Sequence, residues 1–360
     1  MGKPNAASIE ELEGQLDQMF HNQVRDRGFV RSLNAALGEW SRAIVAAADA
    51  LGPSMPSDSE IARGLELARS PVFVCGPARA GTTLLRDLLD GHPELAVIPV
   101  ETGFYGMARP LMQLREDLHR TYLTRTWLQR LAYAPPFWLL PPAESGSPYV
   151  GFARDFAGWW QLPDHHRAAR QRSWPLLTFA LSYAQQLGGG RLPAGARMWV
   201  EKTPSHVHCL DRIWQDLPAA KVIQIVRGPQ AVLASYKAAA MRMPPHRVSR
   251  RRTARHVLAQ MAPAYRIAAH SGNLQAEGRY HLVRYEDLVA DRRAAMGRIA
   301  AFLEIEPLPS LLQPTVGGRP AIRNSSFEAS GPDVGEVLES FDRSLLAVAL
   351  GRYAAKLGYA

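Results

Sequence analysis

The first part of the chain has the hydrophobic pattern of helices. Over residues 8–52, apolar side chains such as Ile9 and Leu12 recur at the three- and four-residue spacing of an amphipathic helix. Pro53 then interrupts this pattern. We therefore expect residues 1–70 to form a helical N-terminal appendage. It packs either on the rest of the chain or on a second subunit, and the second arrangement would make a homodimer.

Beyond residue 70 the apolar positions form short continuous runs, separated by helical patterns. Such runs, bounded by turn residues, are typical of strands that are buried on both faces of a parallel sheet. The first run ends at Cys75, and the others cover residues 95–100, 198–200, 221–226 and 280–284. This alternation predicts an α/β fold of three layers, in which helices flank a central, mostly parallel sheet.

The turn after the first predicted strand has the composition of a phosphate-binding P-loop. Gly76 and Gly81 permit a backbone turn whose N–H groups face an anion, and the helix that follows adds unpaired N–H groups and its dipole. A nucleotide triphosphatase would carry lysine where Thr82 stands. The positive charge comes instead from Arg79, so the loop points away from ATP hydrolysis.

A second basic position follows the predicted strand at residues 221–226. This strand ends in Arg227, where a magnesium-dependent P-loop enzyme would have an aspartate. An arginine there repels a metal ion and can hold a second phosphate, and Ser235 in the next helix could reach the same group. The sequence therefore predicts an anion site and no metal site.

The positive net charge raises the question of which anionic partner the chain binds. The chain of 360 residues carries a formal net charge of +9 and has a pI near 9.8, which is compatible with nucleic-acid binding. A nucleotide with two anionic groups is a sufficient cause, and we expect no nucleic-acid partner. Six arginines between Arg242 and Arg255 exceed that need. They form either a solvated helix face or a surface for an acidic acceptor or partner.

The number of cysteines and the hydropathy of the chain bear on the cellular compartment of the protein. Cys75 and Cys209 are the two cysteines, too few for a disulfide framework. No run of about eighteen apolar residues occurs, so no transmembrane segment is predicted. We expect a cytoplasmic protein.

Five segments, in chain order, resemble sulfotransferases that use 3′-phosphoadenosine 5′-phosphosulfate (PAPS), in particular the bacterial branch related to tyrosylprotein sulfotransferases. These segments are residues 76–85, Glu-Lys-Thr-Pro-Ser-His at 201–206, residues 225–230 with Ser235, residues 284–289 and residues 324–327. The resemblance implies a P-loop-type sulfotransferase domain over residues 71–360. Its acceptor-site insertion would span about 102–195.

The resemblance also implies a donor site. PAPS would be the donor, and adenosine 3′,5′-bisphosphate (PAP) the product. The 5′-phosphosulfate would be held by Arg79, Ala80, Gly81, Thr82, Thr83 and Leu84, the 3′-phosphate by Arg227 and Ser235, and the nucleotide by Tyr285 and by Ser325 or Ser326. Two positions depart from the family pattern: Ala80 replaces a usual serine, and Gly228 replaces a common aspartate.

Catalysis of sulfuryl transfer needs a cation at the leaving group and a base for the acceptor. The family counterpart of Lys202 faces the sulfuryl group, so a fixed lysine would replace a metal ion. Glu101 is the favoured base, because it follows a predicted strand and should return to the loop's end of the sheet. His206, four residues beyond Lys202, is the alternative base.

The acceptor side is less defined. Five of the eight tryptophans lie in the predicted insertion, where they either line an acceptor pocket or pack helices. We expect a hydroxyl acceptor that is a small molecule, a carbohydrate or a lipid, as in secondary metabolism. Two other classes stay open, a P-loop kinase and a nucleic-acid-binding protein.

Overall fold

The computed structural model describes residues 8–21, 27–108, 116–133, 147–163, 174–186, 195–241, 250–321 and 334–359. The chain divides into two compact units. Unit 1 comprises Met1–Glu66 and Met107–Ala194, and unit 2 comprises Leu67–Gly106 and Gly195–Ala360. The domain boundaries expected at residues 70 and 102–195 stay predictions.

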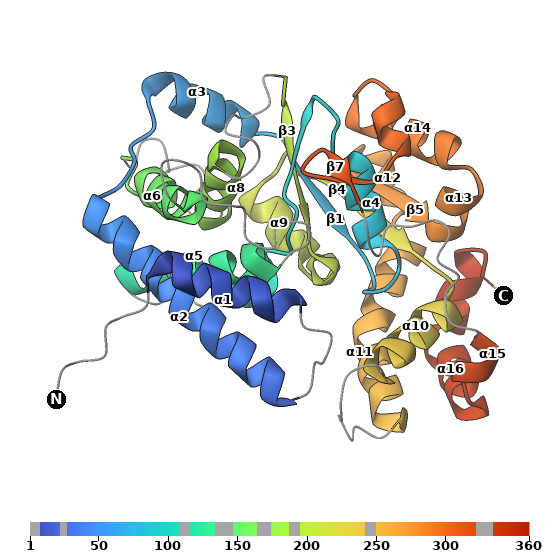
Figure 1. Cartoon of the computed structure of the whole chain (residues 1–360). Coiled ribbons are helices and arrows are strands. Elements are labelled where there is room, and N and C mark those ends of the chain that lie inside the picture. The colour runs from blue at the N-terminus through green and yellow to red at the C-terminus, as the bar shows by residue number, and fades with distance from the viewer. Residues whose placement is uncertain are drawn as a thin grey trace. The chain divides into compact units, whose positions relative to one another are not determined.

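Unit 1 is helical in its described parts. Its helices are α1 (Ile9–His21), α2 (Arg27–Leu51), α3 (Asp58–Leu67, which ends at the boundary), α5 (Glu116–Tyr133), α6 (Pro148–Trp160) and α8 (Trp174–Gln186) (Figure 1). Aromatic rings fill its core: Trp127 packs on Phe179 with ring centroids 4.7 Å apart, and Trp40 meets Tyr149 edge-on. The described tryptophans of the predicted insertion are all buried, so they contribute to packing.

Unit 2 is built on a five-stranded parallel sheet in the order β2-β3-β1-β4-β5 (Figure 1). The strands are β1 (Pro71–Cys75), β2 (Leu95–Val97), β3 (Met198–Lys202), β4 (Lys221–Val226) and β5 (Tyr280–Arg284). All five coincide with the predicted apolar runs. The sequence overestimated only β2, which ends at Val97, three residues before the predicted end.

Helices cover both faces of this sheet. One face packs on α4 (Thr82–Leu89), α13 (Tyr285–Ala290) and α14 (Arg292–Leu303). The other packs on α10 (Pro229–Met241), α11 (Arg250–Ala269) and α16 (Ser340–Lys356). The shorter elements are a π-helical turn (Phe104–Ala108), 3₁₀ turns (Pro204–Cys209 and Pro309–Leu312), α9 (Leu210–Asp216), α12 (Gly272–Ala276), α15 (Val334–Val337) and the hairpin β6 (Thr315–Val316) with β7 (Arg319–Pro320). The predicted α/β fold is confirmed.

Strand order determines where a ligand would bind. After β1 the chain builds β2 and β3 on one side, and then crosses to build β4 on the other. In open α/β sheets, a ligand site lies beyond the carboxyl ends of the strands at such a switch point. Here that place is occupied by the loop from Gly76 to Gly81.

Candidate active site

The loop after β1 has a backbone that leaves little room for side chains. Gly76 and Gly81 adopt φ angles of 142° and 101°. A Cβ on Gly76 would lie 2.2 Å from the carbonyl oxygen of Ile225, and one on Gly81 would lie 2.5 Å from Cδ2 of Tyr285. Arg79 is also left-handed, with φ of 70°, a conformation that strains a residue with a side chain.

Several predicted donor-site residues meet at this loop. Arg79 Nε donates a hydrogen bond to Ser235 Oγ at 3.2 Å, which joins the predicted 5′ and 3′ phosphate sites. The Arg227 guanidinium lies over the ring of Tyr285, 4.4 Å from its centroid, and the same ring packs on Gly81. The ends of β1, β4 and β5 thus bring together residues that are more than 200 positions apart in the chain.

The remaining predicted donor residues differ in exposure. Ala80, Thr82 and Leu84 are buried, and Leu84 belongs to the hydrophobic core under α4. The Ala80 N–H donates to the Pro77 carbonyl at 3.1 Å, whereas those of Thr82 and Leu84 lie in the first turn of α4, where unpaired N–H groups are suited to an anion. Gly81 at the N-cap provides no side-chain hydrogen bond to that helix end. Ser325 and Ser326 lie outside the described residues.

A carboxylate missed by sequence reasoning supports the arginine at the end of β4. Glu286 accepts the backbone N–H of Gly228 at 2.9 Å and the hydroxyl proton of Tyr359 at 2.7 Å. Tyr265 donates its hydroxyl to the carbonyl of Arg227. An acidic group therefore stands beside Gly228, where the resembled family often has an aspartate. Its signal in the sequence was the Arg-Tyr-Glu-Asp segment.

The predicted catalytic lysine and carboxylate form an ion pair. Lys202 Nζ lies 2.5 Å from Glu101 Oε1 and 3.3 Å from Thr83 Oγ1 in the loop helix. The Lys202 side chain is 3% exposed, whereas that of Glu101 is 49% exposed. Burial lowers the pKa of Lys202. The negative charges of Glu101 and Glu201 oppose this shift, and nearby Arg86 adds to it.

His206, the alternative base, is fully buried. Its Nε2 accepts the backbone N–H of Tyr105 at 3.3 Å, and its Nδ1 lies 2.9 Å from Glu201 Oε2. Because an unprotonated nitrogen is needed to accept the Tyr105 proton, the ring proton belongs on Nδ1. Both ring nitrogens are thus engaged within the protein. A catalytic role for His206 stays a prediction.

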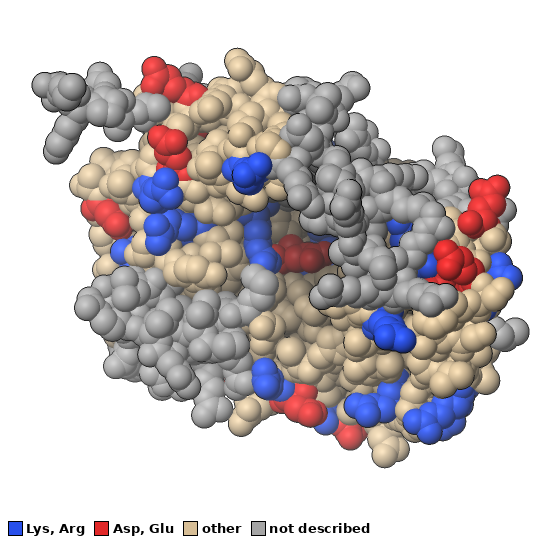
Figure 2. All heavy atoms as spheres, turned by 90° about the horizontal axis from the view of Figure 1, so that it is seen from below, with Lys and Arg blue, Asp and Glu red and all other residues tan. Residues whose placement is uncertain are grey.

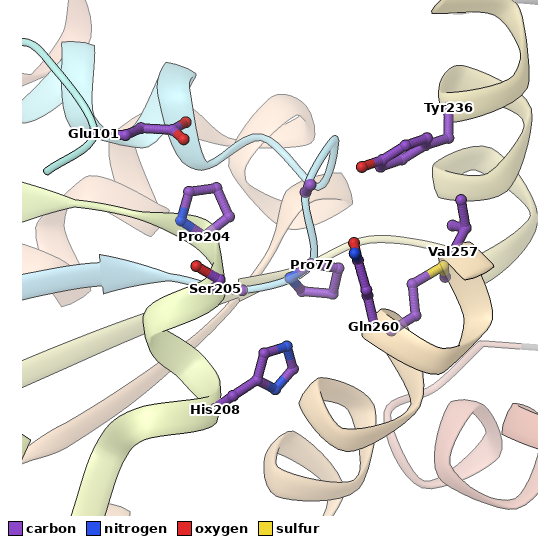
Figure 3. A pocket seen from close by; sticks show the side chains of 11 residues that line it. Pro77, Glu101, Pro204, Ser205, His208, Tyr236, Val257 and Gln260 are labelled. Carbon is purple, nitrogen blue, oxygen red and sulfur yellow. The ribbon is translucent and has the colours of Figure 1, made fainter. Parts of the chain in front are cut away.

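Beside the Lys202–Glu101 ion pair, a pocket of about 280 Å³ opens between the loop and α11 (Figure 3). It is lined by Gly76, Pro77, Ala78, Glu101, Pro204, Ser205, His208, Tyr236, Val257, Gln260 and Met261. Figure 3 shows the carboxylate of Glu101 and the hydroxyl of Tyr236 pointing toward one another across it. Tyr236 and Gln260 were not predicted, because they come from helices whose pattern signals only packing, and neither was His208, which lies in the 3₁₀ turn after β3. Partial burial lowers the pKa of His208.

Within the described helices, none is both long and apolar enough to cross a membrane.

Solved structures include two sulfotransferases to which this chain is similar. The sulfotransferase domain of an olefin synthase from Synechococcus PCC 7002 is 21% identical, covering 81% of this chain and 95% of that domain, with a TM-score of 0.46. Sulfotransferase STF9 from Mycobacterium avium is 14% identical over 100% of this chain and 99% of its own, with a TM-score of 0.49. None of the curated proteins matches.

The family comparison is more specific. The profile described as "Sulfotransferase family" matches residues 71–309, a segment that includes β1, the loop, Lys202, Arg227 and Tyr285. This segment is well over half of the chain. The enzyme belongs to the sulfotransferase family.

Proposed function

We propose that this sulfotransferase moves the sulfuryl group of PAPS to a hydroxyl of a small neutral acceptor, without a metal ion. One observation carries the proposal: Lys202 contacts both Thr83 in the loop helix and Glu101 in the pocket. A buried cation thereby links an anion-binding loop to an accessible carboxylate. This is the arrangement that in-line transfer between a donor and an acceptor requires.

The residues around the loop fit a donor with two anionic ends. Arg79 and Arg227 supply two cations. Arg79 is hydrogen-bonded to Ser235, and Arg227 lies over the Tyr285 ring, which contacts Gly81 of the same loop. The absence of side chains at Gly76 and Gly81 lets the loop pack directly against the Ile225 carbonyl and the Tyr285 ring. Tyr285 offers a ring beside them for the nucleotide. PAPS, when bound, supplies an activated sulfuryl group on its 5′ side.

Two residues would act in the transfer step. Lys202 would stabilise the negative charge that develops on the bridging oxygen as the sulfur–oxygen bond to PAP breaks. Glu101 would take the proton of the acceptor hydroxyl as its oxygen bonds to sulfur. Exposure supports this division of roles, because Glu101 lines the pocket while Lys202 is buried behind it. His206 faces Tyr105 and Glu201 instead.

The pocket lining supports a small, uncharged acceptor. Its walls combine apolar groups, such as Val257 and Met261, with the neutral polar groups of Ser205, Tyr236 and Gln260. Among the described lining residues there is no lysine or arginine to receive an anionic acceptor. At about 280 Å³ the pocket lies just below the range of about 300–1,000 Å³ that is typical of ligand sites. A small molecule, or one end of a carbohydrate or lipid, suits it.

Binding of PAP in the presence of EDTA tests the donor assignment. We expect calorimetry to give the same affinity with EDTA as with Mg²⁺, because Arg79, Arg227 and Lys202 provide the positive charge. Binding that strictly requires Mg²⁺ would favour a kinase-like phosphotransferase. Displacement of PAP by duplex DNA at physiological salt would favour a nucleic-acid-binding protein. On the face shown in Figure 2, basic and acidic side chains of the described residues are interspersed.

Acceptor selectivity is tested with PAPS and a panel of alcohols in the presence of EDTA. Products are identified by mass spectrometry as the acceptor plus one SO₃ unit. We expect neutral alcohols to react faster than carboxylate-bearing analogues of the same size. A preference for the anionic analogues would overturn the neutral-acceptor proposal. The cytoplasmic location and the homodimer stay predictions.

A further inference from the structure

The segment that follows Glu101 is held by side chains rather than by a strand partner. The backbone N–H groups of Thr102, Gly103 and Tyr105 donate to Glu201 Oε1 at 3.1 Å, Thr203 Oγ1 at 3.1 Å and His206 Nε2 at 3.3 Å. We call these three acceptors, Glu201, Thr203 and His206, the 201–206 clamp. It comes from the end of β3 and the 3₁₀ turn after it.

The clamp is connected internally. Glu201 Oε1 also accepts the hydroxyls of Thr203 at 2.6 Å and Thr102 at 2.8 Å, and Glu201 Oε2 lies 2.9 Å from His206 Nδ1. Burial raises the pKa of Glu201, but the contacts with His206, Thr203 and Thr102 outweigh it and hold that pKa below its usual value. Glu201 is therefore a carboxylate.

Burying the Glu201 carboxylate to join β3 to the segment after Glu101 has a large desolvation cost. Glu201 is 0% exposed, and removing an ionised carboxylate from water costs several kcal/mol even when it is paired. An apolar contact could join β3 to the segment after Glu101 with a smaller desolvation cost. Hydrogen bonds, unlike apolar contacts, fix the direction of the backbone groups that donate them. The location of the clamp indicates what is being fixed.

Glu201 is the direct neighbour of Lys202 in β3, and Thr102 is the direct neighbour of Glu101. The hydrogen bond from Thr102 to Glu201 thus ties together the two chain positions that adjoin the proposed cation and the proposed base. We propose that Glu201, Thr203 and His206 are positioning residues, which set the separation of Lys202 and Glu101 for sulfuryl transfer. This inference rests on the proposed function.

Glu201 has a second effect through its charge. The charged groups that face Lys202 are Glu101 from the segment after β2, Arg86 from α4 and Glu201 from β3 itself. When Glu101 takes up a proton during transfer, its negative charge is lost. Glu201 then remains as the anion that opposes deprotonation of Lys202. Removing the charge of Glu201 should therefore lower the pKa of Lys202 further.

The test measures release of PAP from PAPS with water as the acceptor, so no acceptor needs to be known. In this reaction the water oxygen bonds to sulfur, Glu101 takes the proton, and the bridging bond breaks to give sulfate and PAP. Thr203→Val removes the hydroxyl that holds Gly103 and keeps the shape. We expect kcat to fall roughly 10- to 100-fold, as for misplaced catalytic groups, while PAP affinity stays within about threefold. Thr203→Ser should restore kcat.

Glu201→Gln separates charge from position. We expect a similar loss of kcat together with a shift of the basic limb of the pH–rate profile to lower pH, because Lys202 deprotonates earlier. Thr203→Val keeps the charge and should leave that limb in place. Where Glu201→Gln fails to fold, the Thr203 pair alone decides the positioning role.

Asp90→Asn is the matched control. Asp90 is a buried carboxylate of unit 2 that accepts Thr315 Oγ1 at 2.7 Å and the Gly318 N–H at 2.8 Å, away from the candidate site. It should lower thermal stability and keep kcat and the pH profile. The inference is overturned if Thr203→Val keeps kcat within threefold, or if it loses kcat and PAP affinity equally. A wild-type enzyme that neither binds PAP nor consumes PAPS would contradict the proposed function instead.

Discussion

At the scale of single residues, Arg227 tests the donor site most directly. Arg227→Ala removes a charge-assisted contact to the 3′-phosphate, which should cost about 2–4 kcal/mol of PAP binding, or roughly 30- to 1,000-fold in affinity. Calorimetry with PAP, and with adenosine 5′-phosphate, which lacks the 3′-phosphate, measures the loss. The variant should no longer prefer PAP. Arg293→Ala, at an exposed arginine of α14, is the control, and equal affinities for both variants would remove Arg227 from the site.

The base is the second question at this scale. Glu101→Gln keeps the shape of the side chain and removes its basicity, so kcat with an alcohol acceptor should fall roughly 10²- to 10⁴-fold while PAP binds normally. His206→Asn should lose less activity, because His206 contacts Tyr105 and Glu201. The reverse pattern would make His206 the base.

At the scale of elements, the loop between β1 and α4 is tested at Gly81. Alanine there needs a φ of 101°, and its Cβ would meet the Tyr285 ring that stacks on Arg227. Gly81→Ala should therefore weaken PAP binding at least tenfold and lower the melting temperature. Gly297→Ala, in the middle of α14 with nothing within 4 Å, should be neutral or stabilising. If Gly81→Ala binds PAP normally, the loop is not the anion site.

At the scale of the whole molecule, the buried thiol of Cys75 makes the stability of the folded state depend on pH. Burial and, to a smaller extent, the charge of Glu201 raise the pKa of Cys75 far above the ordinary 9.0. The folded state therefore keeps a proton that the unfolded chain loses above that pH. Stability from this group is complete below pH 9.0 and falls as pH rises further.

Urea unfolding at pH 7.5 and pH 10 measures this effect. The wild-type midpoint should decrease between the two, and Cys75→Ala, although less stable at pH 7.5 because it leaves a small cavity, should decrease less. Cys209→Ala, at the other buried cysteine, is the comparison. Equal decreases in wild type and Cys75→Ala would show that ionisation of Cys75 does not contribute.

The fold could be predicted from the sequence because the signals for its strands and loop lie within single short segments. The central strands β1, β3 and β4 are short, largely apolar runs whose residues are almost all buried, so each run signals by itself a strand covered on both faces of the sheet. The same holds for the loop, where Gly76 and Gly81 stand at backbone positions that other residues cannot take without strain. Arg227 was recognisable for a related reason: it directly follows β4, at the carboxyl ends of the strands, where ligands bind in open α/β sheets.

The tertiary structure alone decided which side chains meet. Glu101 and Lys202 are about a hundred positions apart, and their pairing follows from β2 and β3 lying side by side in register. The pocket residues Tyr236 and Gln260 come from helices whose pattern specifies only a packed face, so nothing local marks them. The engagement of both nitrogens of His206 likewise depends on a segment from elsewhere in the chain. Hydrophobic periodicity is encoded within each element, whereas contacts between polar side chains exist only after the sheet has brought its strand ends together.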